Sequence, residues 1–232
     1  MQILSVKNLT VSFDGQSVIQ DLTFGVEAGE NLAIIGPNGS GKTVLLKALM
    51  GIVPKLGEVL WAPGTKIGYV PQKIDADRHL PVNLHDLLMA KAEVLRIQPS
   101  EIRRVLEEVE VSQKILKTSV GHLSGGQFQK ALIAFAFLGN PNVILFDEPT
   151  ASLDQLSEER IYELMGNLQK KDDVTVLLVS HDLNVVSQYA TRVLCLNREK
   201  ICLGTPEEAL QVQVLDKLYS RHQKYYHHKH GH

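Results

Sequence analysis

The amino-acid sequence predicts an α/β fold in which a mostly parallel sheet is covered by helices and interrupted by a helical insert. Short apolar runs alternate with helical patterns on both sides of the insert, and such alternation is typical of parallel sheets. The apolar runs are residues 31–35, 66–70, 143–146 and 174–179. From about residue 81 to residue 138 the apolar spacing is mostly helical, which marks the insert.

Local signals place the individual elements along the chain. The first thirty residues look like two or three short strands with turns at Gly15 and Gly29. A helix is expected to begin at residue 42, and a second at Pro99, because proline is a common first residue of a helix. Apolar side chains at helical spacing cover residues 102–109 and 161–168, and a late hairpin covers residues 192–203.

Length and charge limit the possible classes of protein. The chain has 232 residues, which corresponds to one large domain or one domain with an insertion. Its formal net charge of −2 argues against a general binder of nucleic acids. Two cysteines, Cys195 and Cys202, are too few for a disulfide framework and suit a reducing compartment. No export signal or membrane-spanning segment is expected, because every apolar stretch is short or interrupted.

One segment carries a phosphate-binding motif. The sequence GPNGSGKT matches the pattern G-x-x-x-x-G-K-[ST] in full, with an apolar strand before it and a helix after it. In this context backbone N–H groups surround phosphates at the N-terminus of a helix. Lys42 is expected to reach the β- and γ-phosphates, and the Thr43 hydroxyl to ligate Mg²⁺. The binding residues of this loop are Gly36, Pro37, Asn38, Gly39, Ser40, Gly41, Lys42 and Thr43.

Two further segments carry candidate chemistry. Asp147 and Glu148 follow an apolar strand, where an acid helps to hold Mg²⁺ in phosphate-loop enzymes and a second acid can accept a proton from water. The sequence LSGGQ precedes a helical pattern, and Ser124 and Gln127 fit a capping box. Taken alone, an ordinary capped helix explains this second segment.

The order of the motifs resembles that of the ATP-binding cassette (ABC) ATPases over essentially the whole chain. The phosphate loop is followed by Gln72 in YVPQ, by LSGGQ, by ILFDEPTASLD, and by His181 in LLVSHD. The resemblance implies a P-loop NTPase (RecA-like) core with an N-terminal antiparallel β-subdomain and an inserted helical subdomain. The core would comprise residues 1–72 and 139–232, and the helical subdomain with its signature sequence residues 73–138.

The resemblance also implies roles for single residues. Glu148 would be the general base, Gln72 would sense Mg²⁺ and the attacking water, and His181 would hold the γ-phosphate. ATP and Mg²⁺ are the implied cofactors. The implied catalytic residues are Glu148, His181, Gln72 and Lys42, and the implied Mg²⁺ contacts are Thr43, Gln72 and Asp147.

A head-to-tail homodimer closed by ATP follows from the same resemblance. The signature residues of one subunit would meet the ATP on the phosphate loop of the other, and Asp154 would cross the interface. The signature residues are Ser124, Gly125, Gly126 and Gln127.

At a few positions the chain departs from the family pattern. Phe13 stands where the family commonly has a tyrosine that stacks on adenine, and Val18 is expected beside the same ring. Packing in a core is the alternative for Phe13. Val44 replaces a common Ser or Thr, which removes one phosphate hydrogen bond but no metal ligand. Lys130 replaces a common arginine and keeps the charge.

Within the family the chain is most similar to the ATPases of zinc and manganese importers. The sequences IGYVPQK and VLCLN carry this similarity, as does the histidine-rich tail His222–His232. A single cassette without a coiled-coil insertion fits an importer whose polytopic membrane permease is a separate chain. The ATPase would then lie at the inner face of the cell membrane, and residues from about 73 to 88 would receive the permease.

Other functions stay open on these observations. The chain could serve the import of another small solute or an exporter, or it could be a non-transport ATPase that remodels a soluble partner. An extracellular or periplasmic metal-binding protein would take part only indirectly. For the tail, a zinc-binding role competes with an expression tag and with a solvated segment that has no role.

Overall fold

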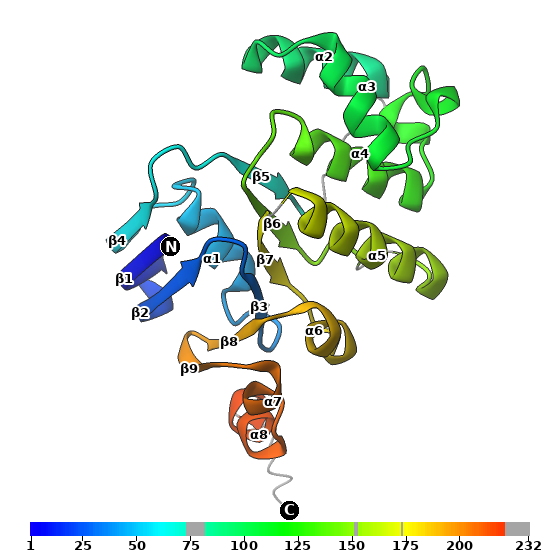
Figure 1. The fold of residues 1–232 in the computed structure, drawn as a ribbon. Coiled ribbons are helices and arrows are strands. Elements are labelled where there is room, and N and C mark those ends of the chain that lie inside the picture. Colours follow the sequence, from blue (N-terminus) through cyan, green and yellow to red (C-terminus); the bar gives the residue numbers. More distant parts are fainter. Residues whose placement is uncertain (73–81, 151–152, 173, 221–232) are drawn as a thin grey trace, which may run out of the picture. The chain divides into compact units, whose positions relative to one another are not determined.

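A computed structural model describes residues 1–72, 82–150, 153–172 and 174–220 (Figure 1). The chain forms two compact units. Unit 1 comprises Met1–Pro63 and Leu177–His232, and unit 2 comprises Gly64–Val176. The boundaries predicted at residues 72 and 139 stay a prediction.

Unit 1 begins with an antiparallel sheet, as expected. Strands β1 (Gln2–Phe13) and β2 (Gln16–Glu27) form a hairpin, and β4 (Leu56–Trp61) pairs with the other edge of β1. The hairpin turns at Asp14 and Gly15, whose φ angles of 50° and 77° suit a two-residue turn between twisted strands. Apolar side chains on one face of β1 are fully buried, and they form the core of this sheet: Leu4, Val6, Leu9 and Val11.

Unit 1 also contains parallel strands. Strand β3 (Asn31–Ile35) pairs in parallel with β8 (Arg192–Asn197), and β8 pairs antiparallel with β9 (Glu199–Gly204). Cys195 and Cys202 are direct partners in this last pair and are joined by a disulfide. This bond was not expected from the sequence. Residues seven apart face each other only because the hairpin turns sharply between them.

Four helices complete the described part of unit 1. They are α1 (Lys42–Leu49), α6 (Leu183–Tyr189), α7 (Pro206–Ala209) and α8 (Val212–Ser220). The C-terminal helices pack on the β3–β8–β9 sheet through a buried apolar cluster that includes Val186, Ala209 and Leu218. The Asn197 side chain at the end of β8 donates a hydrogen bond to the Leu218 carbonyl (2.9 Å), which fastens α8 to the sheet.

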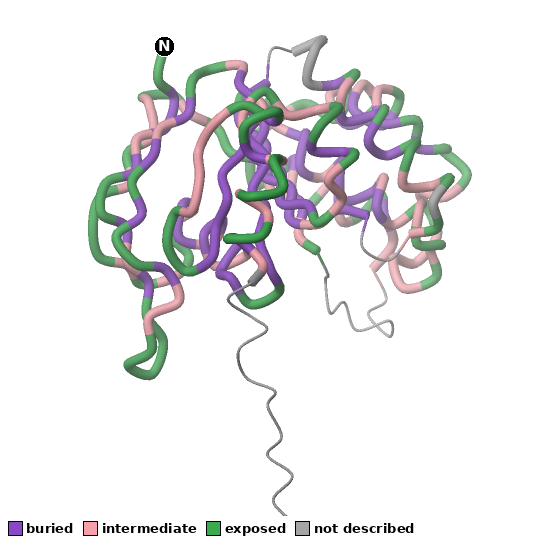
Figure 2. Tube along the Cα trace, turned by 90° about the horizontal axis from the view of Figure 1, so that it is seen from below, coloured by how far each residue is buried: buried purple, intermediate pink, exposed green. Residues whose placement is uncertain are grey.

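In its described residues, unit 2 combines two parallel strands with four helices and two short turns. Strand β5 (Ile67–Val70) pairs in parallel with β6 (Val143–Asp147), so that Tyr69 lies opposite Leu145. All five residues of β6 are buried, as are those of β7 (Thr175–Val179), which crosses the boundary between the units (Figure 2). The helices are α2 (Leu84–Leu95), α3 (Pro99–Glu108), α4 (Gly125–Phe137) and α5 (Gln155–Asp172), with short turns η1 (Gln113–Ile115) and η2 (Val120–His122).

Helix α4 approaches β5 very closely. A Cβ atom added to Gly68 would lie 2.5 Å from Ile144 Cδ1 and 2.6 Å from the Ala136 carbonyl oxygen. Only glycine allows this approach, and it leaves β5 no space to shift toward α4.

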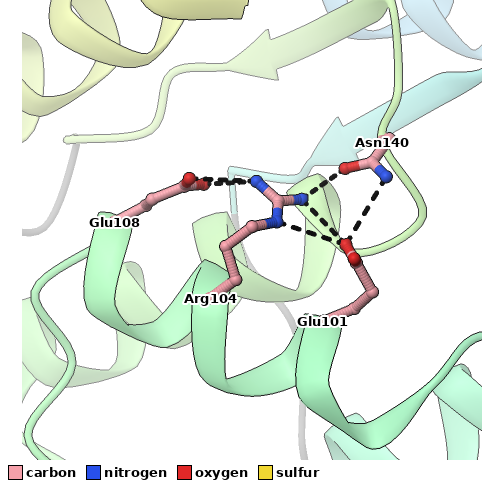
Figure 3. A network of polar contacts seen from close by, with 4 residues as sticks. All are labelled: Glu101, Arg104, Glu108 and Asn140. Carbon is pink, nitrogen blue, oxygen red and sulfur yellow. Dashed lines mark hydrogen bonds and ion pairs between the residues drawn. The ribbon is translucent and has the colours of Figure 1, made fainter.

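A polar network ties α3 to the segment that precedes β6 (Figure 3). The Arg104 guanidinium donates to Glu108 at 2.8 Å and to Glu101 at 3.0 Å. It also donates to the side-chain oxygen of Asn140, which follows α4. Two carboxylates therefore hold the guanidinium in a fixed orientation toward the loop that leads into β6.

Candidate functional site

The phosphate loop connects β3 to α1 in unit 1. Its conformation needs glycine at two places. A Cβ atom on Gly36 would lie 2.0 Å from the Leu196 carbonyl oxygen, and one on Gly41, whose φ is +99°, would lie 3.2 Å from Val18 Cγ1. The loop is thus pressed against β8 on one side and against β2 on the other.

The N-terminus of α1 is open to an anion. Its N-cap residue, Gly41, makes no side-chain cap, and its first turn has no acidic residue. The first N–H groups of the helix therefore point outward at the positive end of the helix dipole. Nearby, the buried Ser40 hydroxyl has no hydrogen-bond partner among the described residues. Both features fit a bound phosphate chain.

Lys42 is folded over the loop. Its ammonium group donates to the carbonyl oxygens of Gly36 (2.9 Å) and Pro37 (3.2 Å), and the side chain is 6% exposed. A buried ammonium group among carbonyl oxygens is held in place as a point charge, which suits a phosphate ligand. Thr43 follows in the first turn of α1.

A cavity of about 280 Å³ lies beside the loop in unit 1. Val18 and Gly39 line it, together with Arg198 from the turn between β8 and β9. The backbone N–H of Arg198 donates to the Ser40 carbonyl (3.2 Å), which places this turn against the loop. Phe13 ends β1 with its ring 41% exposed, so that core packing does not account for it. Arg198 was not identified from the sequence, which gives no signal that its turn meets the loop.

The acid end of β6 lies in unit 2. It consists of Asp147 and Glu148 together with their hydrogen-bond donors Tyr69 and Gln72. Asp147 is 1% exposed and accepts a hydrogen bond from the Tyr69 hydroxyl (3.2 Å). Burial, and then the charge of Asp147, raises the pKa of Tyr69 above its usual value. The next acid, Glu148, accepts a hydrogen bond from the Gln72 amide at 2.6 Å. The structure therefore brings together Gln72 and Glu148, to which the resemblance assigns separate roles, and adds Tyr69, to which the sequence analysis assigns none.

The signature segment begins α4 in unit 2. Ser124 is the N-cap of α4, and its side chain and that of Gln127 bond each other's backbone N–H groups at 3.3 Å and 3.0 Å. The predicted capping box is confirmed. A cavity of about 270 Å³ lies beside Gly126 and Gln127 and is also lined by Lys130, whose ammonium group binds Glu110 at 3.0 Å.

Asp154 lies just before α5 and caps that helix. Its carboxylate accepts from the Ser157 N–H (3.0 Å) and from the Ser157 hydroxyl (2.8 Å). These hydrogen bonds lower the pKa of Asp154. His181 belongs to unit 1, where it is exposed and directly precedes Asp182, the N-cap of α6.

Two predicted features fall wholly or largely outside the part of the chain that the structure describes. The histidine-rich tail and most of the expected permease segment lie outside the described residues. Within residues 1–72, 82–150, 153–172 and 174–220, no three His, Cys, Asp or Glu side chains are grouped to bind a metal ion. In the same ranges no helix is both long and apolar enough to cross a bilayer.

Comparison with known proteins identifies the family. The sequence profile described as ABC transporter matches residues 19–151, which is more than half of the chain. The chain belongs to the ABC transporter family. Accordingly, it is an ATP-binding protein and an ATPase with the P-loop NTPase fold.

Several relatives carry the name zinc import ATP-binding protein ZnuC. The protein from Buchnera aphidicola is 32% identical over 100% of this chain and 98% of its own length. Those from Jannaschia sp. and Magnetococcus marinus are 39% and 40% identical over 89% and 88% of this chain, and the matches cover 84% and 78% of those proteins.

Solved structures agree on the fold. A transporter assigned to the metal-chelate type, in an inward-facing conformation, matches with a TM-score of 0.84 at 27% identity, over 95% of this chain and 90% of that one. A dimeric ATP-binding cassette bound to ADP and Pi after hydrolysis matches with a TM-score of 0.76 at 26% identity, over 88% of this chain and 99% of that one.

Proposed function

We propose that the chain is the ATP-hydrolysing subunit of an importer for a divalent transition metal ion, with zinc favoured over manganese. The observation that carries this proposal is the match along the whole chain to a zinc import ATP-binding protein, with 100% of this chain and 98% of the relative aligned.

In this proposal the phosphate loop binds ATP. The open N-terminus of α1 and the ammonium group of Lys42 take the phosphates, because both present positive charge to them. Phe13 stacks on the adenine, and Val18 lies against the same end of the nucleotide. The unpartnered Ser40 hydroxyl supplies one more hydrogen bond to the bound phosphates.

The side chains also fit Mg²⁺. A hydroxyl on Thr43 and a buried carboxylate on Asp147 are hard oxygen donors, the kind that Mg²⁺ prefers. Gln72 contributes a third oxygen. When bound, Mg²⁺ would neutralise charge on the β- and γ-phosphates.

Hydrolysis then depends on Glu148. Its carboxylate accepts a proton from the attacking water, and the hydrogen bond from Gln72 orients that carboxylate beforehand. His181 holds the γ-phosphate. Since the hydrogen bond joins Glu148 to the residue directly before the proposed permease segment, a displacement of that segment would disturb the general base.

The ATPase is proposed to act as a head-to-tail homodimer. Ser124, Gly126 and Gln127 of one subunit would meet the ATP of the other, with Asp154 near the interface. The related dimeric cassette with ADP and Pi supports the formation of a dimer. To test it, Gly126→Asp protein is mixed with Lys42→Ala protein and ATP-driven association is measured. Mixed dimers should associate better than either mutant homodimer, and equal association would contradict the arrangement.

A polytopic permease would hold this subunit at the inner face of the membrane. A second candidate function, uptake of a chelated metal, is favoured by the fold match to the metal-chelate type transporter. The test is uptake of radiolabelled Zn²⁺, Mn²⁺ and a chelated metal by vesicles that contain the permease and this chain.

ATP-dependent Zn²⁺ uptake should appear, and Lys42→Ala should abolish it. Lys47→Ala, on the last turn of the same helix, is the control that should keep uptake. Uptake of the chelate without free Zn²⁺ would favour the second candidate. Absence of any ATP-dependent metal uptake would contradict both.

A further inference from the structure

Tyr69 begins the YVPQ segment, but the sequence analysis gives it no role, and in the structure it contacts Asp147. Its hydroxyl donates to Asp147 Oδ2 at 3.2 Å. The two residues are 78 apart in sequence and meet because β5 and β6 are parallel neighbours, with Tyr69 opposite Leu145 and Val70 opposite Phe146. The ring is therefore directed along the sheet toward the acid at the end of β6.

The contact is built on rigid elements. Asp147 is 1% exposed, and the strand that carries Tyr69 is pressed against Ala136 and Ile144 at Gly68. Neither strand has space to slide, so the distance between hydroxyl and carboxylate is set by the fold. By comparison, Gln72, which donates a hydrogen bond to Glu148, is exposed and lies two residues after the end of β5.

We propose that Tyr69 is a positioning residue for Asp147, whose hydroxyl fixes the orientation in which the carboxylate meets Mg²⁺. This inference rests on the proposed role of Asp147. A carboxylate group turns easily about its terminal bond. A fixed donor on one oxygen restricts that rotation, and such second-layer hydrogen bonds commonly decide how well a ligand holds its metal.

Loss of the Tyr69 hydroxyl should affect Mg²⁺ binding and ATP binding differently. Loss of the hydroxyl should weaken only the part of ATP binding that depends on Mg²⁺, because the hydroxyl acts through the Asp147 carboxylate. A role in packing alone would instead lower stability and leave the Mg²⁺ dependence unchanged.

The test uses the full chain with a fluorescent, non-hydrolysable ATP analogue titrated with Mg²⁺. Tyr69→Phe keeps the ring and removes the hydroxyl, and it should raise the half-saturating Mg²⁺ concentration by about 10-fold, the lower end of the usual effect of second-layer contacts. Affinity for the analogue without Mg²⁺ should not change. The matched control is Tyr162→Phe, which removes a tyrosine hydroxyl elsewhere in unit 2, one that shares a hydrogen bond with Thr150 (3.0 Å).

Asp147→Asn and the double variant make the test decisive. Asp147→Asn alone should raise the half-saturating Mg²⁺ concentration, and Tyr69→Phe should add nothing in that background, because both changes act through one carboxylate. A wild-type Mg²⁺ dependence in Tyr69→Phe beside a shifted Asp147→Asn would overturn this inference alone. A wild-type dependence in Asp147→Asn would overturn the proposed Mg²⁺ role of Asp147 and this inference with it.

Discussion

The phosphate loop and the acid end of β6 are constructed in different ways. The loop, residues 36–43, is a continuous segment whose binding groups are mainly backbone N–H groups, shaped by glycines. The acid end joins side chains from two strands, and its contacts connect residues 76 and 78 apart in sequence. The loop is therefore sensitive to backbone changes, whereas the acid end is sensitive to the loss of single polar atoms.

This difference predicts separable defects. Changes at the acid end should affect Mg²⁺ use and turnover while nucleotide binding persists. Changes of backbone shape in the loop should affect folding and binding together.

Glu148→Gln should give the largest loss of turnover. The amide keeps the shape of the side chain but cannot accept the proton from water, so the ATPase rate should fall by about 10²–10⁴. Steady-state ATP hydrolysis with excess Mg²⁺ measures this. Glu159→Gln on the exposed side of α5 is the control and should hydrolyse ATP at the parent rate. If Glu148→Gln also keeps the parent rate, Glu148 is not the base.

Gly36→Ala tests the backbone character of the loop. The added Cβ would lie 2.0 Å from the Leu196 carbonyl, and β8, which carries that oxygen, is buried and unable to retreat. We expect loss of both ATP binding and stability, because the loop and the strand must separate.

Gly39→Ala is the matched control for Gly36→Ala. It also places alanine at a positive φ, +76°, but no atom lies within 4 Å of the added Cβ. It should cost only the conformational penalty, about 1–2 kcal/mol of unfolding free energy. Denaturant unfolding and ATP binding on both variants check this. Equal defects in the two would show that contact with β8 does not shape the loop.

Arg104→Ala should have the smallest effect, on stability alone. It removes the network with Glu101, Glu108 and Asn140, in which the arginine side chain is 38% exposed. Partly exposed ion pairs stabilise weakly, so we expect a loss of about 1 kcal/mol. The exposed Arg103 on the same helix is the control, and Arg103→Ala should unfold like the parent. A changed ATP affinity in Arg104→Ala would show that this network reaches the nucleotide site.

The sequence predicts those parts of the fold that depend on residues close together in the chain. The sequence predicts strand β3 at its observed bounds. It also predicts the capping box on the two residues that form it, Ser124 and Gln127. Both depend on neighbours in the chain. Strand β4 was missed because four of its six residues are exposed and Gly57, at φ +85°, interrupts its alternation.

The missed parts of the candidate site have one cause in common. The roles of Tyr69 and Arg198 depend on contacts between segments that lie far apart in the sequence. No short segment of sequence contains that information. The phosphate loop, by contrast, is contained in eight consecutive residues and was predicted in full.

In the proposed mechanism the phosphate loop binds ATP, and Glu148 at the acid end of β6 is the base for its hydrolysis. The most direct measurement is equilibrium binding of ATP with Mg²⁺ to Lys42→Ala and Glu148→Gln, each paired with its turnover rate. Glu148→Gln should bind ATP as the parent does while turnover is lost, and Lys42→Ala should lose both. Loss of binding in Glu148→Gln in proportion to its turnover, or parent-like binding in Lys42→Ala, would contradict the claim.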